Sequence, residues 1–284
     1  MRLQRGTCDA TLSHHRRHIR ELLNHLGDEP SQWDAHRLRA FVLEQSRSRG
    51  WAATQTATTA LRMFVRCLIA NGHCAVGVDA AIPRLAHWRL AALPRSLQPD
   101  DVERIIASCD PASPVGRRDR AILLLLARLG LRAGDIAHLR LRDIDWRRAW
   151  LHVWGKSRRE TRLPLSQEVG QAIVTYLQHG RLRPTSDALF VRCRAPLSAL
   201  DSSGAVTAIV ARALRRAGVT RPSRGAAHLL RHSVATSMLR HGASLQEIGV
   251  LLRHRSIETT QIYAKVDVAA LQPIAQSWPE VPPG

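Results

Sequence analysis

Apolar residues recur at helical spacing through the first part of the chain. The spacing predicts a first helix that stops at Gly27, a second helix, and a third over residues 54–70. The apolar positions of these helices are Ile19, Leu22, Leu23, Leu26, Leu38, Phe41, Val42, Leu61, Phe64, Val65, Leu68 and Ile69. We therefore expect a small helical domain over residues 1–83.

The helical pattern breaks after this block. Pro83, Pro94 and Pro99 exclude long helices, because proline lacks the backbone N–H that a helix interior needs. The segment is also basic, with Arg84, Arg89 and Arg95. We interpret residues 84–97 as a basic linker between two domains.

A second apolar pattern follows the linker. Asp100 and Asp101 come directly after Pro99, which indicates a helix start with acidic residues near the positive end of the helix dipole. The continuous apolar run from Ala121 to Ala127 predicts a buried central helix over residues 118–129. Too short to span a bilayer and flanked by arginines, this run does not indicate a membrane helix.

Between residues 143 and 165 the period changes from helical to alternating. Leu151 and Val153 alternate with Trp150, His152 and Trp154, which predicts a short antiparallel sheet. Helices resume at Glu168 and end around Val266 to Ile274, and residues 276–284 form a Pro-rich tail. The expected fold is mainly α with a small antiparallel β-sheet in a second domain over residues 98–275.

The charge balance indicates a polyanionic partner. Lys and Arg number 42 against 23 Asp and Glu, a formal net charge of +19 with a pI near 11.5. Basic side chains that neutralise phosphates release condensed counterions and bind nucleic acid without regard to sequence. A solvated basic surface with no partner is the alternative, and binding to an anionic membrane is a weaker one.

Other classes of protein are disfavoured by what the sequence lacks. No apolar stretch near the N-terminus precedes a small-residue cleavage site, so we expect a cytoplasmic protein associated with the nucleoid. Five cysteines without a Cys-x-x-Cys spacing argue against a disulfide framework and a zinc ribbon. A Gly-Lys-Ser at residues 155–157 is not a P-loop, because Trp150 stands where that motif has Gly. We expect no cofactor.

Two candidate sites lie in the first half of the second domain. Arg132 follows the predicted central helix, and Asp135 lies three residues further on. Taken alone, this pair is better explained as a surface arginine and a helix-capping aspartate. Lys156 lies in the predicted turn between two strands and, taken alone, is better explained as a solvated lysine.

A third cluster combines two histidines with an arginine. His228, Arg231 and His232 share one face of a predicted helix. The two histidines have the spacing of metal ligands, but Leu229 replaces the glutamate of a zinc-protease motif and no further ligand cluster supports zinc. We expect no metal site.

The last two clusters surround His254 and Tyr263. The segment from Ser244 to Lys265 is also compatible with a helix-turn-helix. Its core positions would be Leu245, Ile248, Leu251 and Ile262. A transcriptional regulator therefore stays open as an alternative.

Six of these residues occur in an order that resembles the tyrosine recombinase, or phage integrase, family, particularly its Xer-like members. They are Arg132, Lys156, His228, Arg231, His254 and Tyr263. The matching motifs are Leu-Gly-Leu-Arg at 129–132, His-Leu-Leu-Arg-His at 228–232 and His-Arg-Ser-Ile-Glu-Thr-Thr-Gln-Ile-Tyr at 254–263. The resemblance covers most of the chain. One departure is Arg253, where the family commonly has glycine, and it affects the expected loop geometry.

Phosphodiester chemistry assigns a role to each of these residues. Arg132 and Arg231 are expected to hold the phosphate, with His254 as a third donor and Asp135 orienting the arginines. Tyr263 is the expected nucleophile. Its phenol needs a base, for which His228 is the candidate. The resemblance assigns protonation of the leaving DNA oxygen to Lys156.

The resemblance implies a site-specific recombinase that breaks and rejoins double-stranded DNA through a 3′-phosphotyrosine, without ATP or metal, as a homotetramer or heterotetramer. DNA-backbone contacts are expected from Arg62, Arg66, Arg158 and Arg159. A type IB topoisomerase is the alternative enzyme, and a noncatalytic DNA-binding regulator is the alternative from another class. Integration, excision and resolution stay open as biological purposes.

Overall fold

The structure is a computed structural model. It describes residues 9–84, 95–154, 160–182, 186–200, 202–220, 225–254, 256 and 259–266. The chain divides into two compact units, Met1–Trp88 and Arg89–Gly284, called here the N-terminal and C-terminal units. Most of the predicted linker lies outside the described residues, and the domain limits drawn from the sequence stay predictions.

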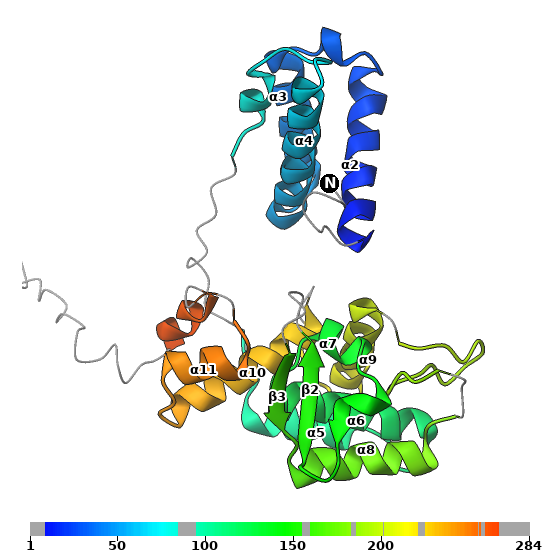
Figure 1. Cartoon of the computed structure of the whole chain (residues 1–284). Helices are drawn as coiled ribbons and strands as arrows, with labels where there is room; N and C mark the ends of the chain where they lie inside the picture. The colour runs from blue at the N-terminus through cyan, green and yellow to red at the C-terminus, as the bar shows by residue number, and fades with distance from the viewer. Residues whose placement is uncertain are drawn as a thin grey trace, which may run out of the picture. The chain divides into compact units, whose positions relative to one another are not determined.

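The N-terminal unit is a bundle of three helices, α2 (Asp9–Leu26), α3 (Ala35–Ser48) and α4 (Trp51–Ala70) (Figure 1). These are the three helices that the apolar spacing predicts, and α2 ends before Gly27, whose φ is 87°. A short 3-10 helix, η1 (Pro30–Gln32), lies between α2 and α3, and a second one, η2 (Val78–Ala81), follows α4. The core contains Leu22, Leu26, Trp33, Leu38, Phe41, Val42, Leu61, Val65, Cys74 and Ile82.

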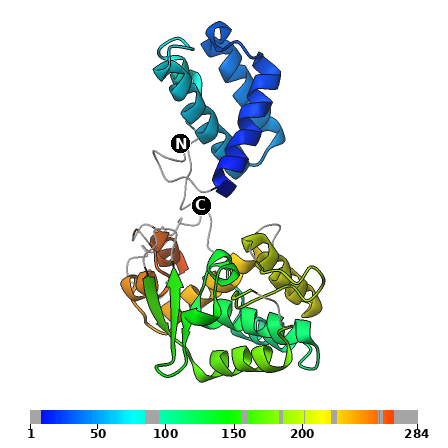
Figure 2. The ribbon, with the colours of Figure 1, turned by 45° about the vertical axis from the view of Figure 1, so that its right-hand side comes forward.

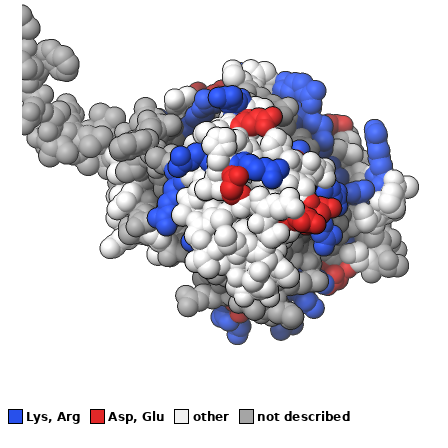
Figure 3. Space-filling model, turned by 90° about the horizontal axis from the view of Figure 1, so that it is seen from above, with Lys and Arg blue, Asp and Glu red and all other residues white. Residues whose placement is uncertain are grey.

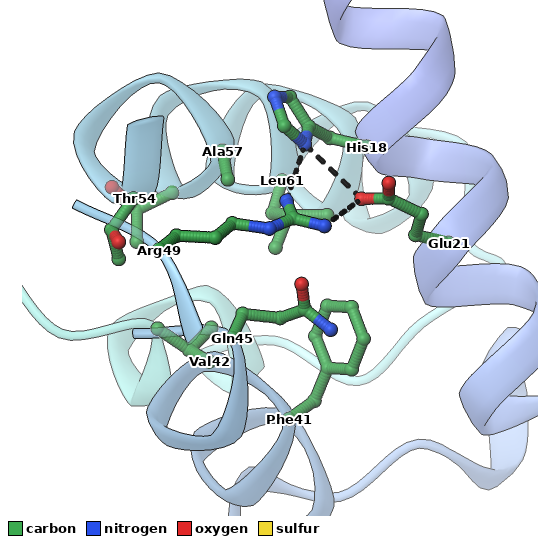
Figure 4. Close-up of a pocket in the computed structure, with 10 residues that line it drawn as sticks. His18, Glu21, Phe41, Val42, Gln45, Arg49, Thr54, Ala57 and Leu61 are labelled. Atoms are coloured by element: carbon green, nitrogen blue, oxygen red, sulfur yellow. Dashed lines mark hydrogen bonds and ion pairs between the residues drawn. The ribbon is translucent and has the colours of Figure 1, made fainter. Parts of the chain in front are cut away.

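A polar cluster joins the helices of this unit beside a small cavity (Figure 4). Arg49 follows α3 and donates to Glu21 of α2 over 2.9 Å, while its other terminal nitrogen lies 3.0 Å from Nδ1 of His18. The Arg49 and His18 hydrogen bonds lower the pKa of Glu21 against the opposing effect of burial. The cavity beside them, about 10 Å³, has room for about one water molecule.

The C-terminal unit combines helices with one small sheet (Figures 1 and 2). Strand β2 (Trp150–Trp154) lies between β1 (Ile144–Asp145) and β3 (Glu160–Pro164), and both pairings are antiparallel. In order, the elements are α5 (Pro99–Ala107), α6 (Pro114–Leu129), α7 (Ala133–Ala137), η3 (Leu141–Asp143), β1 (Ile144–Asp145), β2 (Trp150–Trp154), β3 (Glu160–Pro164), α8 (Gln167–His179), α9 (Ser203–Arg216), α10 (Ala226–Arg240), α11 (Leu245–Leu251) and η5 (Gln261–Val266). The predicted fold class is confirmed.

Helix α6 is the centre of this unit. Its residues from Ala121 to Leu126 are all fully buried, as the continuous apolar run predicts. Each such leucine contributes roughly 1.5–3 kcal/mol by leaving water. Leu151 of β2 faces Leu163 of β3 and joins the same core, whereas Trp154 on the opposite face is 55% exposed. The predicted alternation of the strands is therefore confirmed.

A smaller apolar cluster holds the end of the described chain. Tyr263 of η5 packs with Ala235 of α10, with Ile248 of α11 and with Leu252, the residue that follows α11. At the place of the possible helix-turn-helix, the structure has a seven-residue α-helix and a six-residue 3-10 helix, not two α-helices. The expected end of the last helix, up to Ile274, lies outside the described residues.

Charge on the surface is mixed where the structure describes it. Figure 3 shows Lys and Arg scattered over the visible surface, with Asp and Glu among them. Several arginines are paired, for example Arg140 with Asp187 over 2.8 Å and Arg128 with Glu168 over 2.8 Å. Among the described helices, none combines the length and the apolar character needed to cross a membrane.

Candidate active site

The site begins where helix α6 ends. Gly130 takes a φ of 57°, in the left-handed region that suits glycine, and so turns the chain out of the helix. Space requires glycine as well, because a Cβ there would lie 2.6 Å from Cδ2 of Leu252. Arg132 follows two residues later at the start of α7. The Leu-Gly-Leu-Arg motif therefore places an arginine at the edge of the buried core.

Arg231 is the most deeply buried cation of the site. It lies on α10 with 4% of its surface exposed and donates to the backbone carbonyls of Gly130 and Leu252. These carbonyls end α6 and α11. Burial, with the charges of Arg132 and Arg253, lowers the pKa of Arg231 to about 9, so it stays charged at neutral pH.

Arg253 adds a third guanidinium beside these two. Its side chain is 8% exposed, and Nη2 lies 2.5 Å from Oδ2 of Asp135. Its backbone carbonyl accepts from Nη2 of Arg132 over 2.9 Å. Asp135 also accepts from the backbone N–H of Arg132 over 3.1 Å. The predicted orienting carboxylate therefore contacts the Arg132 backbone and the Arg253 side chain.

Tyr263 lies against His232. Its side chain is 1% exposed, and its hydroxyl lies 2.7 Å from Nδ1 of His232. Burial raises the pKa of Tyr263 to about 12, against a small opposing effect of Arg231. Burial, then His228 and Arg231, lowers the pKa of His232 to about 4. At neutral pH the pair is therefore a protonated phenol in contact with a neutral imidazole.

His228 lies one turn before His232 on α10, with ring centroids 6.2 Å apart. Burial and the charges of Arg231 and Arg132 lower its pKa. His228 was the base expected from the sequence, whereas the phenol hydroxyl contacts His232. From the sequence, His232 was named only as a residue on the same helix face as His228. Its position four residues after His228 was the pattern that pointed to it.

His254 completes the group. Its Nδ1 lies 2.7 Å from Oγ1 of Thr260, a fully buried threonine. Burial, then the charges of Arg231 and Arg132, lowers the pKa of His254 to about 4. The Thr260 contact holds the ring beside the arginines.

The structure therefore brings six sequence-selected residues into one place: Arg132, Asp135, His228, Arg231, His254 and Tyr263. Lys156, Arg158 and Arg159 lie outside the described residues. From the sequence, Arg253 was noted only because it differs from the glycine expected from the resemblance. That difference was the pattern in the sequence that pointed to this residue.

The two arginines predicted to bind DNA from the N-terminal unit make contacts within that unit. Arg62 donates to the carbonyls of Ile82 and Pro83 over 2.9 and 3.2 Å. Arg66 pairs with Asp79 over 2.7 Å and is largely exposed. Their contact with DNA stays a prediction.

The chemistry of this site suits an anion. Guanidinium groups converge from three segments, and Arg forms charge-assisted hydrogen bonds to phosphate oxygens. No group of three or more His, Cys, Asp or Glu that could hold a metal ion occurs among the described residues. A phenol with a neutral imidazole at its oxygen, beside guanidinium groups that suit a phosphate, has the chemistry to attack a bound phosphodiester.

Comparison with known proteins shows similarity to one family over most of the C-terminal unit. The model of the phage integrase family matches residues 95–269. "Putative integrase/recombinase y4rA" of Sinorhizobium fredii is 42% identical over 84% of this chain and 58% of its own length. A second relative from that organism, y4rF, is 37% identical. The chain spans about three fifths of the length of these two relatives.

Other relatives match over most of both chains. Tyrosine recombinase XerC of Thermodesulfovibrio yellowstonii is 29% identical over 95% of this chain and 90% of its own. Among solved structures, the XerH recombinase bound to its palindromic difH substrate superposes with a TM-score of 0.70 at 22% identity, over 88% of this chain and 73% of that one. A lambda integrase dimer bound to a COC′ core site also gives 0.70, at 19% identity, over 98% and 94%. At such identities these structures support the fold.

Proposed function

This chain belongs to the phage integrase family, and from that premise we propose that it is a site-specific DNA recombinase with Tyr263 as its nucleophile. In this proposal the enzyme cleaves and rejoins double-stranded DNA through a 3′-phosphotyrosine. It acts at the nucleoid and needs neither ATP nor metal. The single observation that carries it is the 2.7 Å contact of the Tyr263 hydroxyl with His232, beside the buried Arg231.

The first step forms one bond and breaks one. The Tyr263 oxygen attacks the scissile phosphorus, and the bond from phosphorus to the 5′ oxygen of the next nucleotide breaks. Negative charge grows on the nonbridging oxygens, and Arg132 and Arg231 stabilise it, with His254 as a further donor. Lys156 protonates the departing 5′ oxygen, a role that rests on the family motif.

The proton of Tyr263 passes to the imidazole at its oxygen. His232 is therefore our preferred base, and His228 is the second candidate. Without DNA this transfer is strongly unfavourable, because the phenol has a pKa of about 12 and the imidazole one of about 4. A bound phosphate brings negative charge that raises the pKa of nearby histidines. Binding of DNA thus prepares the base, and the phenol stays unreactive otherwise.

Reversal of this step completes the reaction. The 5′ hydroxyl of a second DNA strand gives its proton to the Lys156 amine and attacks the phosphotyrosine, the phosphorus–Tyr263 bond breaks, and the proton held by the imidazole returns to the tyrosine oxygen. The energy of the phosphodiester is retained in the covalent intermediate, so no ATP is consumed. Exchange between two sites requires several active sites on one DNA assembly. We therefore propose a tetramer of identical or related chains.

The experiment that tests this function is capture of the covalent intermediate. A duplex selected from a random-sequence library for binding to the protein is incubated with it, and the reaction is stopped with SDS. Wild type should give a protein–DNA adduct whose position maps the cleavage site, and a nick next to that site should increase the yield. Tyr263→Phe should bind the same duplex and give no adduct.

The products separate the alternative functions. Joining of two differently labelled duplexes at the mapped site indicates recombination. An adduct with relaxation of supercoiled plasmid, but no joining, indicates a topoisomerase. DNA binding with no adduct from wild type would instead indicate the noncatalytic regulator.

A further inference from the structure

We propose that Arg253 is a third phosphate-binding guanidinium of this active site and contacts a nonbridging oxygen of the scissile phosphate. The proposal rests on the proposed function and extends it to a residue outside the six matched motif positions. Arg253 stands at a left-handed backbone position that glycine would suit. The chain would then hold the phosphate with Arg132, Arg231 and Arg253.

Backbone conformation is the first observation. Arg253 has a φ of 53°, in the left-handed region, where a residue other than glycine is strained by roughly 1 kcal/mol or more. Glycine would adopt this conformation freely. The arginine side chain therefore has to be explained by its contacts and not by the needs of the turn.

Burial of the side chain is the second observation. Only 8% of it is exposed, and Nη2 is the nitrogen that pairs with Asp135. Nε and Nη1 are buried and have no hydrogen-bond partner among the described residues. Buried donors are nearly always paired, because an unpaired one costs about 1–3 kcal/mol. The Nε and Nη1 nitrogens of the Arg253 guanidinium are thus the two that an anion could partner.

Position is the third observation. The carbonyl of Arg253 accepts from the Arg132 side chain over 2.9 Å, and the preceding residue, Leu252, accepts from Arg231. The backbone at 252–253 therefore lies between the two proposed phosphate-binding arginines. A phosphate offers several lone pairs on its nonbridging oxygens, and guanidinium forks match them. The anion that suits Arg132 and Arg231 suits Arg253 too.

The competing explanation is a tether. The Arg253–Asp135 ion pair connects the end of α11 to α7 and could serve only to fix the loop. A tether needs one nitrogen, whereas the observed side chain buries two more without protein partners. A phosphate ligand would partner Nε and Nη1 while Nη2 stays paired with Asp135, whereas a tether accounts for Nη2 alone.

A double-mutant cycle tests the proposal. Arg253→Gly removes the guanidinium and suits the backbone, so it should fold. Its affinity and that of wild type are measured on the selected duplex with the mapped scissile phosphate either intact or replaced by an uncharged methylphosphonate. We expect Arg253→Gly to weaken binding of intact DNA about 10-fold more than binding of the neutralised DNA. Its rate of adduct formation should fall about 10²-fold.

Ala149→Gly is the matched control, because Ala149 has a φ of 52° and no charge. It should leave both affinity and adduct rate unchanged. Equal losses on both DNAs, or no loss, would overturn the proposal. If Arg253→Gly does not fold, Arg253→Lys, which keeps the charge and loses the fork, decides by the same cycle. Failure of wild type to form any adduct would instead reject the proposed function.

Discussion

The hydroxyl of Tyr263 lies 2.7 Å from Nδ1 of His232, although the two residues are 31 positions apart. The contact joins the 3-10 helix η5 to the histidine face of α10. Of the two histidines on this face of α10, His232 is therefore the one in contact with the tyrosine hydroxyl, and His228 lies one turn earlier.

Replacing His232 should slow the chemistry and spare DNA binding. His232→Ala removes the acceptor at the Tyr263 oxygen, and loss of a general base costs about 10²-fold or more. Single-turnover adduct formation on the selected duplex measures it. His241→Ala, an exposed histidine directly after α10, is the control. If His228→Ala forms the adduct slowly and His232→Ala forms it at the wild-type rate, the base is His228.

The pH dependence of stability should report the buried histidines. The folded-state pKa values of His232 and His254 are about 4, below the ordinary 6.5, so the unfolded chain binds more protons between these values. Their contribution to stability is complete above pH 6.5 and is lost as pH falls towards 4. Thermal unfolding from pH 7 to 4 should therefore show a shallower decline for His232→Gln than for wild type. Parallel curves would show that His232 is not buried as a neutral group.

Arg231→Lys should damage both fold and function. Lysine keeps the charge but cannot donate to the carbonyls of Gly130 and Leu252 in the same fork, so we expect a loss of about 2 kcal/mol in the free energy of unfolding. Adduct formation should fall about 10²-fold. Urea unfolding and adduct rates measure the two effects. Arg240→Lys, an exposed position on the same helix, should change neither.

Gly130→Ala should destabilise the C-terminal unit by about 1–3 kcal/mol. The added Cβ would meet Leu252 at 2.6 Å and would also be strained at a φ of 57°. Gly134→Ala is the matched control, because a Cβ at Gly134 has open space. Equal unfolding midpoints for the two variants would contradict the close approach of Leu252.

Chelation should leave the reaction intact. Charge on the transferred phosphate is neutralised by arginines in the proposed mechanism, so adduct formation should proceed in EDTA at the rate seen without it. The measurement is a time course with and without added magnesium or zinc. A rate that requires either ion would contradict the proposed mechanism.

Local patterns in the sequence were enough to predict the helices and the sheet. Gly27 stops α2, and the run from Ala121 to Leu126 is the buried centre of α6, because apolar period and helix stop signals act over a few residues. The segment around Tyr263 was also compatible with the second α-helix of a helix-turn-helix, which stayed an alternative. In the structure Tyr263 lies in a 3-10 helix that packs on α10.

The sequence predicts which residues belong to the candidate site better than it predicts which of them touch. Arg132, Arg231 and Tyr263 were selected by their order along the chain, but no local signal tells which histidine meets the tyrosine hydroxyl. That choice depends on how η5 packs against α10, which is a long-range property. The partner of Asp135 likewise depends on the chain path at Arg253, 118 residues away.

Arg231 ties together the ends of two helices with the same guanidinium that is proposed to hold the phosphate. A substitution at Arg231 that changes the contact with the helix ends therefore also changes the proposed contact with the phosphate. Most sequence variation among functional descendants of this protein should therefore avoid Gly130, Arg231 and Leu252. A mutational library screened separately for folding and for recombination would lose the same variants at these positions in both screens.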